Sequence, residues 1–203
     1  RVKLNTYTPT KGKKMSINID FYNENKDKLS ADYNSLSFEQ VHGDILNLMP
    51  VSGNILDVGC GSGRDAFALA KKGYNVVAVD PAKEMLALAK ETHNHKNITW
   101  INDLMPSLEN VFKLNIKFDF ILLSAVWMHI PEESRKESLI NLKSLLNDNA
   151  KLVISLRHGA FSDGRQELPV SISELELIPG TGKEGRVTRE DILNYIITRN
   201  SEI

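Results

Sequence analysis

The chain has 203 residues, a length that fits one domain and allows a core to be buried without disulfides or metal. Hydrophobic residues make up 41% and charged residues 25%, which is typical of globular proteins and argues against disordered and membrane-spanning classes. The formal net charge of −1 gives no overall attraction for nucleic acid. The single cysteine, Cys60, excludes a disulfide framework and a cysteine zinc site, so we expect a reducing, cytoplasmic setting.

The N-terminal part is expected to be helical after a basic leader. Residues 1–15 form this leader, with five basic and no acidic residues from Arg1 to Lys14, and we expect it to be flexible. Residues 16–50 carry apolar side chains at the spacing of one helix face, and Ser37 followed by Gln40 predicts a capping box. The apolar positions are Phe38, Val41, Ile45 and Leu48.

The central part alternates between strand and helix patterns. The predicted strands are Asn54–Val58, Asn75–Val79, Ile98–Ile101, Phe118–Ser124 and Lys151–Leu156. The predicted helices are Arg64–Lys72, a segment with Met85, Leu86 and Leu88, and one that begins near Pro131 with Leu139, Leu142 and Leu146 on one face. Apolar strands that alternate with helices indicate an α/β, Rossmann-like fold, with a mostly parallel sheet covered by helices on both faces.

The pattern changes after the fifth predicted strand. We assign residues 51–170 to the α/β core and residues 171–203 to an atypical C-terminal segment, whose last clear helix is Val187–Ile197. No run in this segment predicts the closing strand pair that such a sheet normally has. The longest apolar stretch, Phe118–Ile130, is interrupted by Asp119 and is too short to span a bilayer, so we expect no membrane contact.

The most informative stretch is ILDVGCGSGRD, residues Ile55 to Asp65, in which a strand ends in a glycine-rich turn before a helix. Glycine lets a backbone approach a ligand closely, but NAD-binding and purely structural turns share this pattern. Asp80 ends the second strand, 23 residues after Asp57, where a carboxylate can accept hydrogen bonds from both ribose hydroxyls. Asp103 follows the third strand and can accept from an exocyclic adenine amine. The sequence therefore predicts a nucleoside-binding crevice at the carboxyl ends of the strands.

With these residues, the segment Asn54–Leu156 resembles the class I S-adenosylmethionine-dependent methyltransferases, particularly the broad group of small bacterial members. The glycine turn is GCGSG rather than the dinucleotide form, because its third glycine comes two residues after the second. A sulfonium nucleoside has no pyrophosphate to cradle. The resemblance therefore favours S-adenosylmethionine over NAD as the cofactor.

The resemblance also implies roles for individual residues on the cofactor side. Asp57 would support the methionine ammonium, Asp80 would hold the ribose, and Ser124 would lie near the methionine moiety. The other predicted residues would lie beside the cofactor. The backbone at Gly59, Gly61 and Gly63 would run past its amino-acid and ribose parts, and its adenine would be contacted by Pro81, Met85, Asp103 and Leu104. Met85 and Leu104 also fit a simple core role. The early segment 16–50, with Tyr22 and Tyr33, would fold over the cofactor as a lid.

The acceptor side follows the fourth and fifth strands. The sequence SAVWMHIP, residues Ser124 to Pro131, lacks the signatures of amino-directed DNA methyltransferases, and we expect no DNA substrate. His129 can serve as a general base or pack against the following helix. Trp127 can wall the acceptor pocket or belong to the core. Arg157 and His158 can bind an anionic acceptor or lie in a solvated loop. No metal site is expected.

The C-terminal segment carries a second, weaker resemblance. Residues Pro179–Ile197 are similar to the second half of the peripheral-subunit-binding domain of dihydrolipoyl acyltransferases, where a GTGxxGR loop leads into a short helix. The basic first helix of that small domain is missing. Apolar side chains in the predicted helix indicate a packing surface, so a homo-oligomer formed through this segment is possible. These side chains are Ile192, Leu193, Ile196 and Ile197.

Three functions stay open from the sequence. The first is an enzyme that methylates a small-molecule nucleophile, which is favoured because the chain has neither strong basicity nor an added recognition domain. The second is a protein or RNA methyltransferase. The third is a cofactor-binding or subunit-docking protein without turnover, which the altered C-terminal segment suggests.

Overall fold

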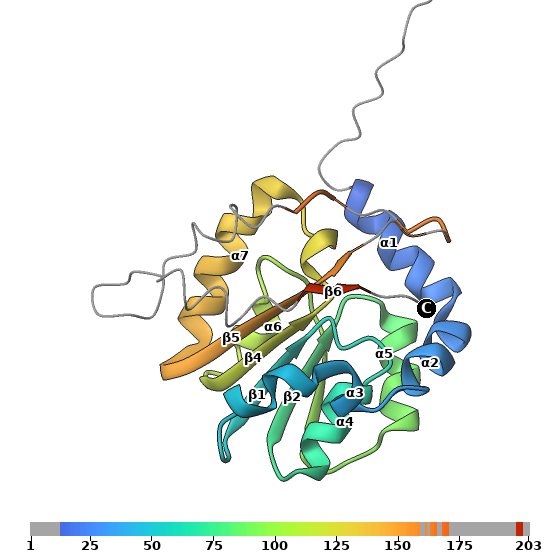
Figure 1. The fold of residues 1–203 in the computed structure, drawn as a ribbon. Coiled ribbons are helices and arrows are strands. Elements are labelled where there is room, and N and C mark those ends of the chain that lie inside the picture. Colours follow the sequence, from blue (N-terminus) through green and yellow to red (C-terminus); the bar gives the residue numbers. More distant parts are fainter. Residues whose placement is uncertain (1–12, 159–160, 162, 166–167, 171–197, 201–203) are drawn as a thin grey trace, which may run out of the picture.

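The computed structural model describes residues 13–158, 161, 163–165, 168–170 and 198–200. Its centre is a parallel sheet with the strand order β3-β2-β1-β4-β5-β6 (Figure 1). Because the chain runs outward from β1 to β3 and then returns to β4 on the other side, the order reverses between β1 and β4. In open α/β sheets ligands bind beside such a switch point, at the carboxyl ends of the strands.

The element bounds are as follows. The strands are β1 Asn54–Val58, β2 Asn75–Asp80, β3 Ile98–Asn102, β4 Phe118–Ser124, β5 Leu146–His158 and β6 Thr198–Asn200. The α-helices are α1 Lys13–Glu24, α2 Lys26–Asn34, α3 Phe38–His42, α4 Arg64–Lys71, α5 Lys83–Thr92, α6 Glu109–Phe112 and α7 Glu132–Leu145. Two 3₁₀-helices, η1 and η2, span Gly43–Leu48 and Trp127–His129.

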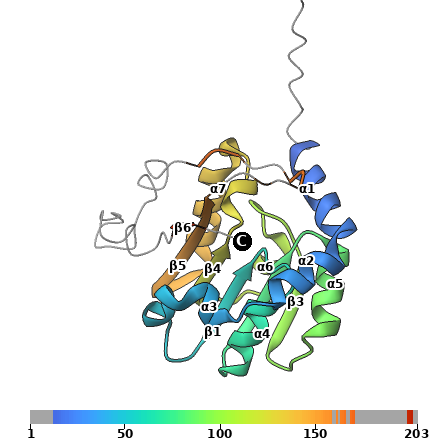
Figure 2. The ribbon, with the colours of Figure 1, turned by 45° about the vertical axis from the view of Figure 1, so that its right-hand side comes forward.

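Alternation along the strands gives the sheet two buried faces. Ile55 of β1 packs with α4 residues such as Leu69, whereas its neighbour Leu56 packs in the cluster that contains Leu142 of α7. Successive strand side chains point to opposite faces, so a strand covered on both sides must be apolar throughout. Figure 2 shows the two layers, with α3 and α4 on one side of the sheet and α7 on the other.

The expected α/β fold with a parallel sheet is confirmed, and β1 and β4 have the predicted bounds. The expected helical face with Leu146 is wrong in one respect, because α7 ends at Leu145 and β5 begins at Leu146. The sequence also missed β6, which pairs in parallel with the end of β5. The predicted helix Val187–Ile197 and the subunit-binding resemblance lie outside the described residues.

The N-terminal segment is helical, as predicted, and begins within the expected leader, since α1 starts at Lys13. The capping box is confirmed: the backbone N–H of Gln40 donates to Ser37 Oγ, and the backbone N–H of Ser37 donates to Gln40 Oε1. The helices α1 and α2 contact α5 (Figure 1). Across the described ranges, no helix is both long and apolar enough to cross a membrane.

Candidate functional site

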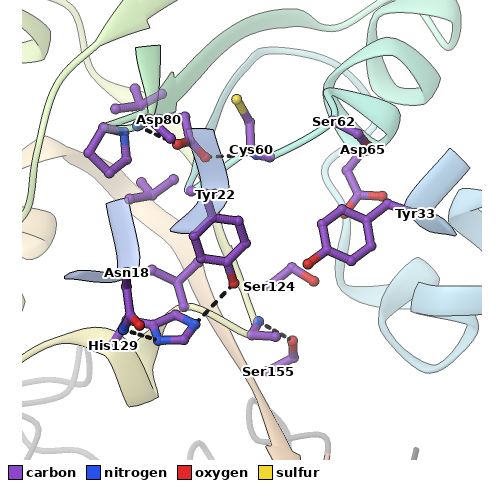
Figure 3. Close-up of a pocket in the computed structure, with 18 of the residues that line it drawn as sticks. Asn18, Tyr22, Tyr33, Cys60, Ser62, Asp65, Asp80, Ser124, His129 and Ser155 are labelled. Atoms are coloured by element: carbon purple, nitrogen blue, oxygen red, sulfur yellow. Dashed lines mark hydrogen bonds between the residues drawn. The ribbon is translucent and has the colours of Figure 1, made fainter. Parts of the chain in front are cut away.

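A cavity of about 500 Å³ opens at the carboxyl ends of the strands, where the strand order reverses. Residues after β1, β2 and β3 form one side, which we call the cofactor side. The acceptor side comprises α1, the turns after β4 and β5, and the lining residues Phe161 and Arg165. Figure 3 shows side chains from both sides pointing toward a common space. Cavities of this size hold small molecules.

The glycine turn after β1 brings the backbone to the cavity wall. Gly59 has a φ of +73°, and a Cβ atom there would lie 2.4 Å from Cγ2 of Val126. Gly61 has a φ of +50°, and its N–H donates to Oδ2 of Asp80 at 2.9 Å. Glycine meets both needs because it has no Cβ and adopts positive φ without strain. The turn therefore bonds to the end of β2 through Gly61, and at Gly59 its backbone lies close against the side chain of Val126.

Asp80 is the best-defined polar group of the cofactor side. Its Oδ1 accepts from the backbone N–H of Ala82 at 2.9 Å, and its other oxygen accepts from Gly61. The side chain is buried, and this burial raises its pKa to about 6 despite the two N–H donors. Each carboxylate oxygen has a further lone pair for a ligand donor. Asp80 is thus fixed in place and suited to accept hydrogen bonds from neighbouring hydroxyls.

Two further carboxylates lie near the glycine turn: Asp57 is buried behind it, and Asp65 lies at the start of α4 and lines the cavity. Burial and the neighbouring charge of Asp65 raise the pKa of Asp57, whose buried Oδ2 has no hydrogen-bond partner among the residues that the structure describes. Asp65 accepts hydrogen bonds from His42 at 2.8 Å and from Arg64 at 2.7 and 3.0 Å. Burial alone would raise the pKa of Asp65, but these partners lower it to about 2. This buried ion cluster fixes α3 to the start of α4.

On the acceptor side, His129 projects from η2 toward α1 (Figure 3). Its Nδ1 lies 3.1 Å from Asn18 Nδ2, and its Nε2 lies 3.2 Å from Tyr22 Oη. The ring of Phe161 stacks on the imidazole with a centroid distance of 5.6 Å. Contacts from two distant sequence regions, α1 and the segment with Phe161, therefore orient one imidazole at the cavity wall.

The turn that carries His129 begins with an unusual backbone conformation. Ala125 follows β4 with a φ of +55°, and its N–H donates to both the carbonyl oxygen and Oγ of Ser155 at 3.1 Å. The left-handed region costs a residue with a Cβ about 1–2 kcal/mol. Such strain persists where surrounding contacts hold it and is frequent at ligand sites. Here it redirects the chain from β4 into η2, beside the cavity.

Most of the predicted site residues come together. The cavity is lined by the predicted positions Gly59, Gly61, Asp80, Pro81, Asp103, Leu104, Ser124 and His129. Tyr22 and Tyr33 of the expected lid line it as well. Asp103 also has a structural task, because its Oδ2 accepts from the backbone N–H groups of Asn110 and Val111 at the start of α6.

Four predicted residues are not on the cavity wall. Met85 is fully buried against Leu29 and Ala82, and Trp127 is fully buried in the core with α7, so both occupy the core position that the sequence also allowed. A Cβ at Gly63 would lie 2.6 Å from the ring of Trp100, so this glycine serves helix packing. Asp57 lies behind the turn.

The two predicted anion-binding residues, Arg157 and His158, belong to β5, where they pair with Arg199 and Asn200 of β6. Their side chains lie outside the described part. Among the residues that the structure describes, the arginine that lines the acceptor side is Arg165.

Sequence reasoning missed Asn18, Ser155, Phe161 and Arg165 as cavity residues. Asn18 lies more than one hundred positions from its partner His129, so no local pattern links them. A signal did exist for the other three, because they end or follow a strand whose carboxyl end faces the crevice. Among the described residues, no group of three or more His, Cys, Asp or Glu is arranged to hold a metal ion.

Comparison with known proteins agrees with this geometry. Residues 55–149 match the model of a family described as a methyltransferase domain. A probable S-adenosyl-L-methionine-dependent methyltransferase, TehB of Haemophilus influenzae, is 27% identical over 66% of this chain and 46% of its own length. A ubiquinone biosynthesis O-methyltransferase of Rickettsia bellii is 31% identical over 50% of this chain and 40% of its own. The chain thus spans less than half the length of these curated relatives.

Solved structures show the same fold. A complex of DhpI with SAH superposes with a TM-score of 0.63 at 16% identity, over 82% of this chain and 86% of that one. A TehB-like SAM-dependent methyltransferase from Corynebacterium glutamicum gives a TM-score of 0.54 at 24% identity, over 81% and 82% of the two chains.

The strand order, the glycine turn and Asp80 define a Rossmann-like nucleoside-binding domain. Within that class, residues 55–149 match a methyltransferase domain family, and this central part of the chain is similar to S-adenosyl-L-methionine-dependent methyltransferases.

Proposed function

We propose that the protein transfers a methyl group from S-adenosylmethionine to a small-molecule nucleophile. The observation that carries this proposal is the position of Asp80, held by Gly61 beside a cavity that continues to His129. When bound, S-adenosylmethionine supplies an activated methyl group on a sulfonium. Gly59 and Gly61 line the cavity and present backbone that a nucleoside can approach closely, and Asp80 has lone pairs for its ribose hydroxyls.

The chain's own residues would position the acceptor and remove its proton. Asp57, whose buried Oδ2 has no hydrogen-bond partner among the described residues, lies behind the turn, so it is the proposed support for the cofactor's ammonium through water. Tyr22 and His129 lie on the opposite wall, and burial raises the pKa of Tyr22, so its hydroxyl stays protonated. His129 is the proposed base. One of its ring nitrogens would give up its hydrogen bond to α1 and form one with the acceptor instead. Positioning of this kind supplies much of the rate enhancement in a reaction of an activated donor.

A small acceptor fits the cavity better than a macromolecule does, because α1 and α2 contribute lining residues that cover it. The names of two relatives support this proposal. One is a probable S-adenosyl-L-methionine-dependent methyltransferase, and the other is an O-methyltransferase of ubiquinone biosynthesis. The composition and the single reduced cysteine, Cys60, support a cytoplasmic setting.

Replacing Asp80 by alanine tests the cofactor site. We expect the affinity for S-adenosylmethionine to fall more than tenfold, because lost hydrogen bonds to a charged group cost about 1.5–3 kcal/mol. Isothermal titration calorimetry measures the change. Asp119→Ala is the matched control, since Asp119 also accepts a backbone N–H, that of Asn54, but at the amino end of β1. An Asp80→Ala affinity equal to that of the control would remove Asp80 from the site.

The raised pKa of Asp80 predicts a pH dependence of binding. Ribose hydroxyls donate to the ionised carboxylate, so cofactor binding lowers its pKa and releases a proton. With a pKa of about 6 in the free protein, we expect affinity to be roughly tenfold lower at pH 5 than at pH 7 and constant above that range. Titrations in buffers of matched ionic strength measure this. The Asp80→Asn variant should bind weakly without the pH dependence; a wild-type affinity independent of pH would contradict this role.

A further inference from the structure

The charged residues that line the cavity are divided between its two sides, with the acidic residues and the Asp65-paired Arg64 on the cofactor side. Every acidic lining residue in the described part belongs to the cofactor side: Asp65, Asp80 and Asp103. On the acceptor side, the described lining residue with a permanent charge is Arg165. Around it stand neutral donors, among them the hydroxyls of Tyr22 and Tyr33. A ligand group near this wall therefore meets positive charge and hydroxyl donors.

Arg165 is held in a fixed orientation. Its Nε and Nη2 donate to Asp163 at distances between 2.6 and 3.1 Å, and its guanidinium lies 4.1 Å from the ring centroid of Phe161. The Arg165 side chain is 9% exposed, whereas that of Asp163 is 35% exposed. Asp163 thus lies on the solvent side, where water screens its charge more strongly. The opposite edge of the guanidinium is directed at the two tyrosines.

On that edge, Nη1 of Arg165 donates to Tyr33 Oη at 2.9 Å and to Tyr22 Oη at 3.4 Å. A hydroxyl whose oxygen accepts from a cation becomes a stronger donor through its own hydrogen, because hydrogen bonds in series polarise one another. Burial opposes the charge of Arg165, but hydrogen bonds to Asp163 and Tyr22 raise its pKa, so the cation persists. Tyr22 Oη also lies 3.2 Å from Nε2 of His129, so a carboxylate would take the Tyr22 donor in place of that contact. Two polarised hydroxyls in front of a guanidinium then match the oxygens of a carboxylate.

We infer that Arg165, Tyr22 and Tyr33 form a subsite for a carboxylate group of a bound ligand. The inference rests on the proposed function for its setting, since the carboxylate can belong either to the amino-acid end of the cofactor or to the acceptor. Both sources share the same recognition chemistry. The acceptor source would restrict turnover to nucleophiles that carry an acid group.

A latch is the competing explanation. The same hydrogen bonds join α1 and α2 to the segment with Arg165, so they could serve only to hold the lid in place. A latch and a carboxylate subsite differ in one measurable respect. Loss of a latch weakens charged and neutral ligands alike, whereas loss of the subsite weakens only the carboxylate.

The test compares two pairs of probes in the full chain and in the variants Arg165→Met and Tyr33→Phe. The first pair is S-adenosylhomocysteine and its decarboxylated analogue. The second pair is phenylacetate and phenylacetamide, titrated into protein saturated with S-adenosylhomocysteine and into ligand-free protein. Tyr74→Phe is the control variant, because it removes a tyrosine hydroxyl that donates to the Pro50 carbonyl away from the cavity.

We expect both variants to lower the affinity for the carboxylate member of at least one pair by about tenfold or more, with the neutral member and the control unchanged. A change in the first pair assigns the subsite to the cofactor, and a change in the second assigns it to the acceptor. Equal changes within each pair, or none, would overturn the inference in favour of a latch. If the wild type binds neither nucleoside, the proposed function fails, while the phenylacetate pair in ligand-free protein still decides the subsite.

Discussion

Replacing His129 by alanine is expected to lower methyl-transfer turnover by roughly 10²–10⁴-fold while the affinity for S-adenosylmethionine stays nearly constant, which is the range for loss of a general base. The reason is positional, since His129 lines the acceptor side and the proposed cofactor ligands come from β1 to β4. Turnover is measured with a labelled methyl donor, and affinity by titration calorimetry.

His93→Ala is the matched control for this variant. His93 also stacks on a phenylalanine, Phe67, and hydrogen bonds to Asn34, but it lies off the cavity wall. The control should keep its turnover. If His129→Ala instead loses stability and activity in the same proportion, His129 is a packing residue, and the acceptor proton must leave by another route.

Replacing Asp65 by asparagine is expected to lower the free energy of unfolding by about 3–5 kcal/mol, the usual cost of removing one partner from a buried ion cluster. His42 and Asp65 are both almost fully buried and lie 2.8 Å apart, and Arg64 donates to both carboxylate oxygens. Asparagine removes the negative charge and leaves these two donors without it. Urea unfolding, extrapolated linearly to water, measures the loss.

The exposed ion pair of Glu39 and Lys72 provides the comparison, and Glu39→Gln should leave the unfolding midpoint unchanged because solvent screens this pair. The Asp65 contribution also has a defined pH window. Since its pKa falls from 3.8 to about 2 on folding, the stabilisation is present above pH 3.8 and is lost as the pH falls toward 2. An Asp65→Asn protein with the wild-type midpoint would show that the cluster contributes no net stability.

Local patterns in the sequence predicted the sheet and the cofactor side. The apolar runs at Asn54–Val58 and Phe118–Ser124 are strands with those bounds, since a strand buried on both faces must be apolar throughout. Asp80 was identifiable because it ends one predicted strand, and the glycine turn follows the end of another. In a parallel sheet such neighbours meet at one edge, so position along the chain translates directly into position in space.

The acceptor side could not be predicted in this way. Asn18 and His129 meet across 111 positions, and Tyr22 and Arg165 meet across 143. Their contact depends on where α1 packs in the folded protein. The spacing of apolar residues along the sequence does not contain that information. For Met85 and Trp127 the sequence allowed both a binding and a core role. Each lies close to a lining residue, Ala82 and Val126 respectively, but its own side chain is buried in the core.

The long sequence separations across the acceptor wall have a consequence for dynamics. Closing a longer loop costs more conformational entropy, and regions held by few contacts open locally with less free energy than the core of a sheet. The amide hydrogens of α1 should therefore exchange with deuterated water before those of β1 and β4. Under the proposed function, such local opening would give the product a way out while the sheet stays folded. Ligand exchange and global stability are then separate properties, so substitutions in α1 can quicken release without weakening the sheet.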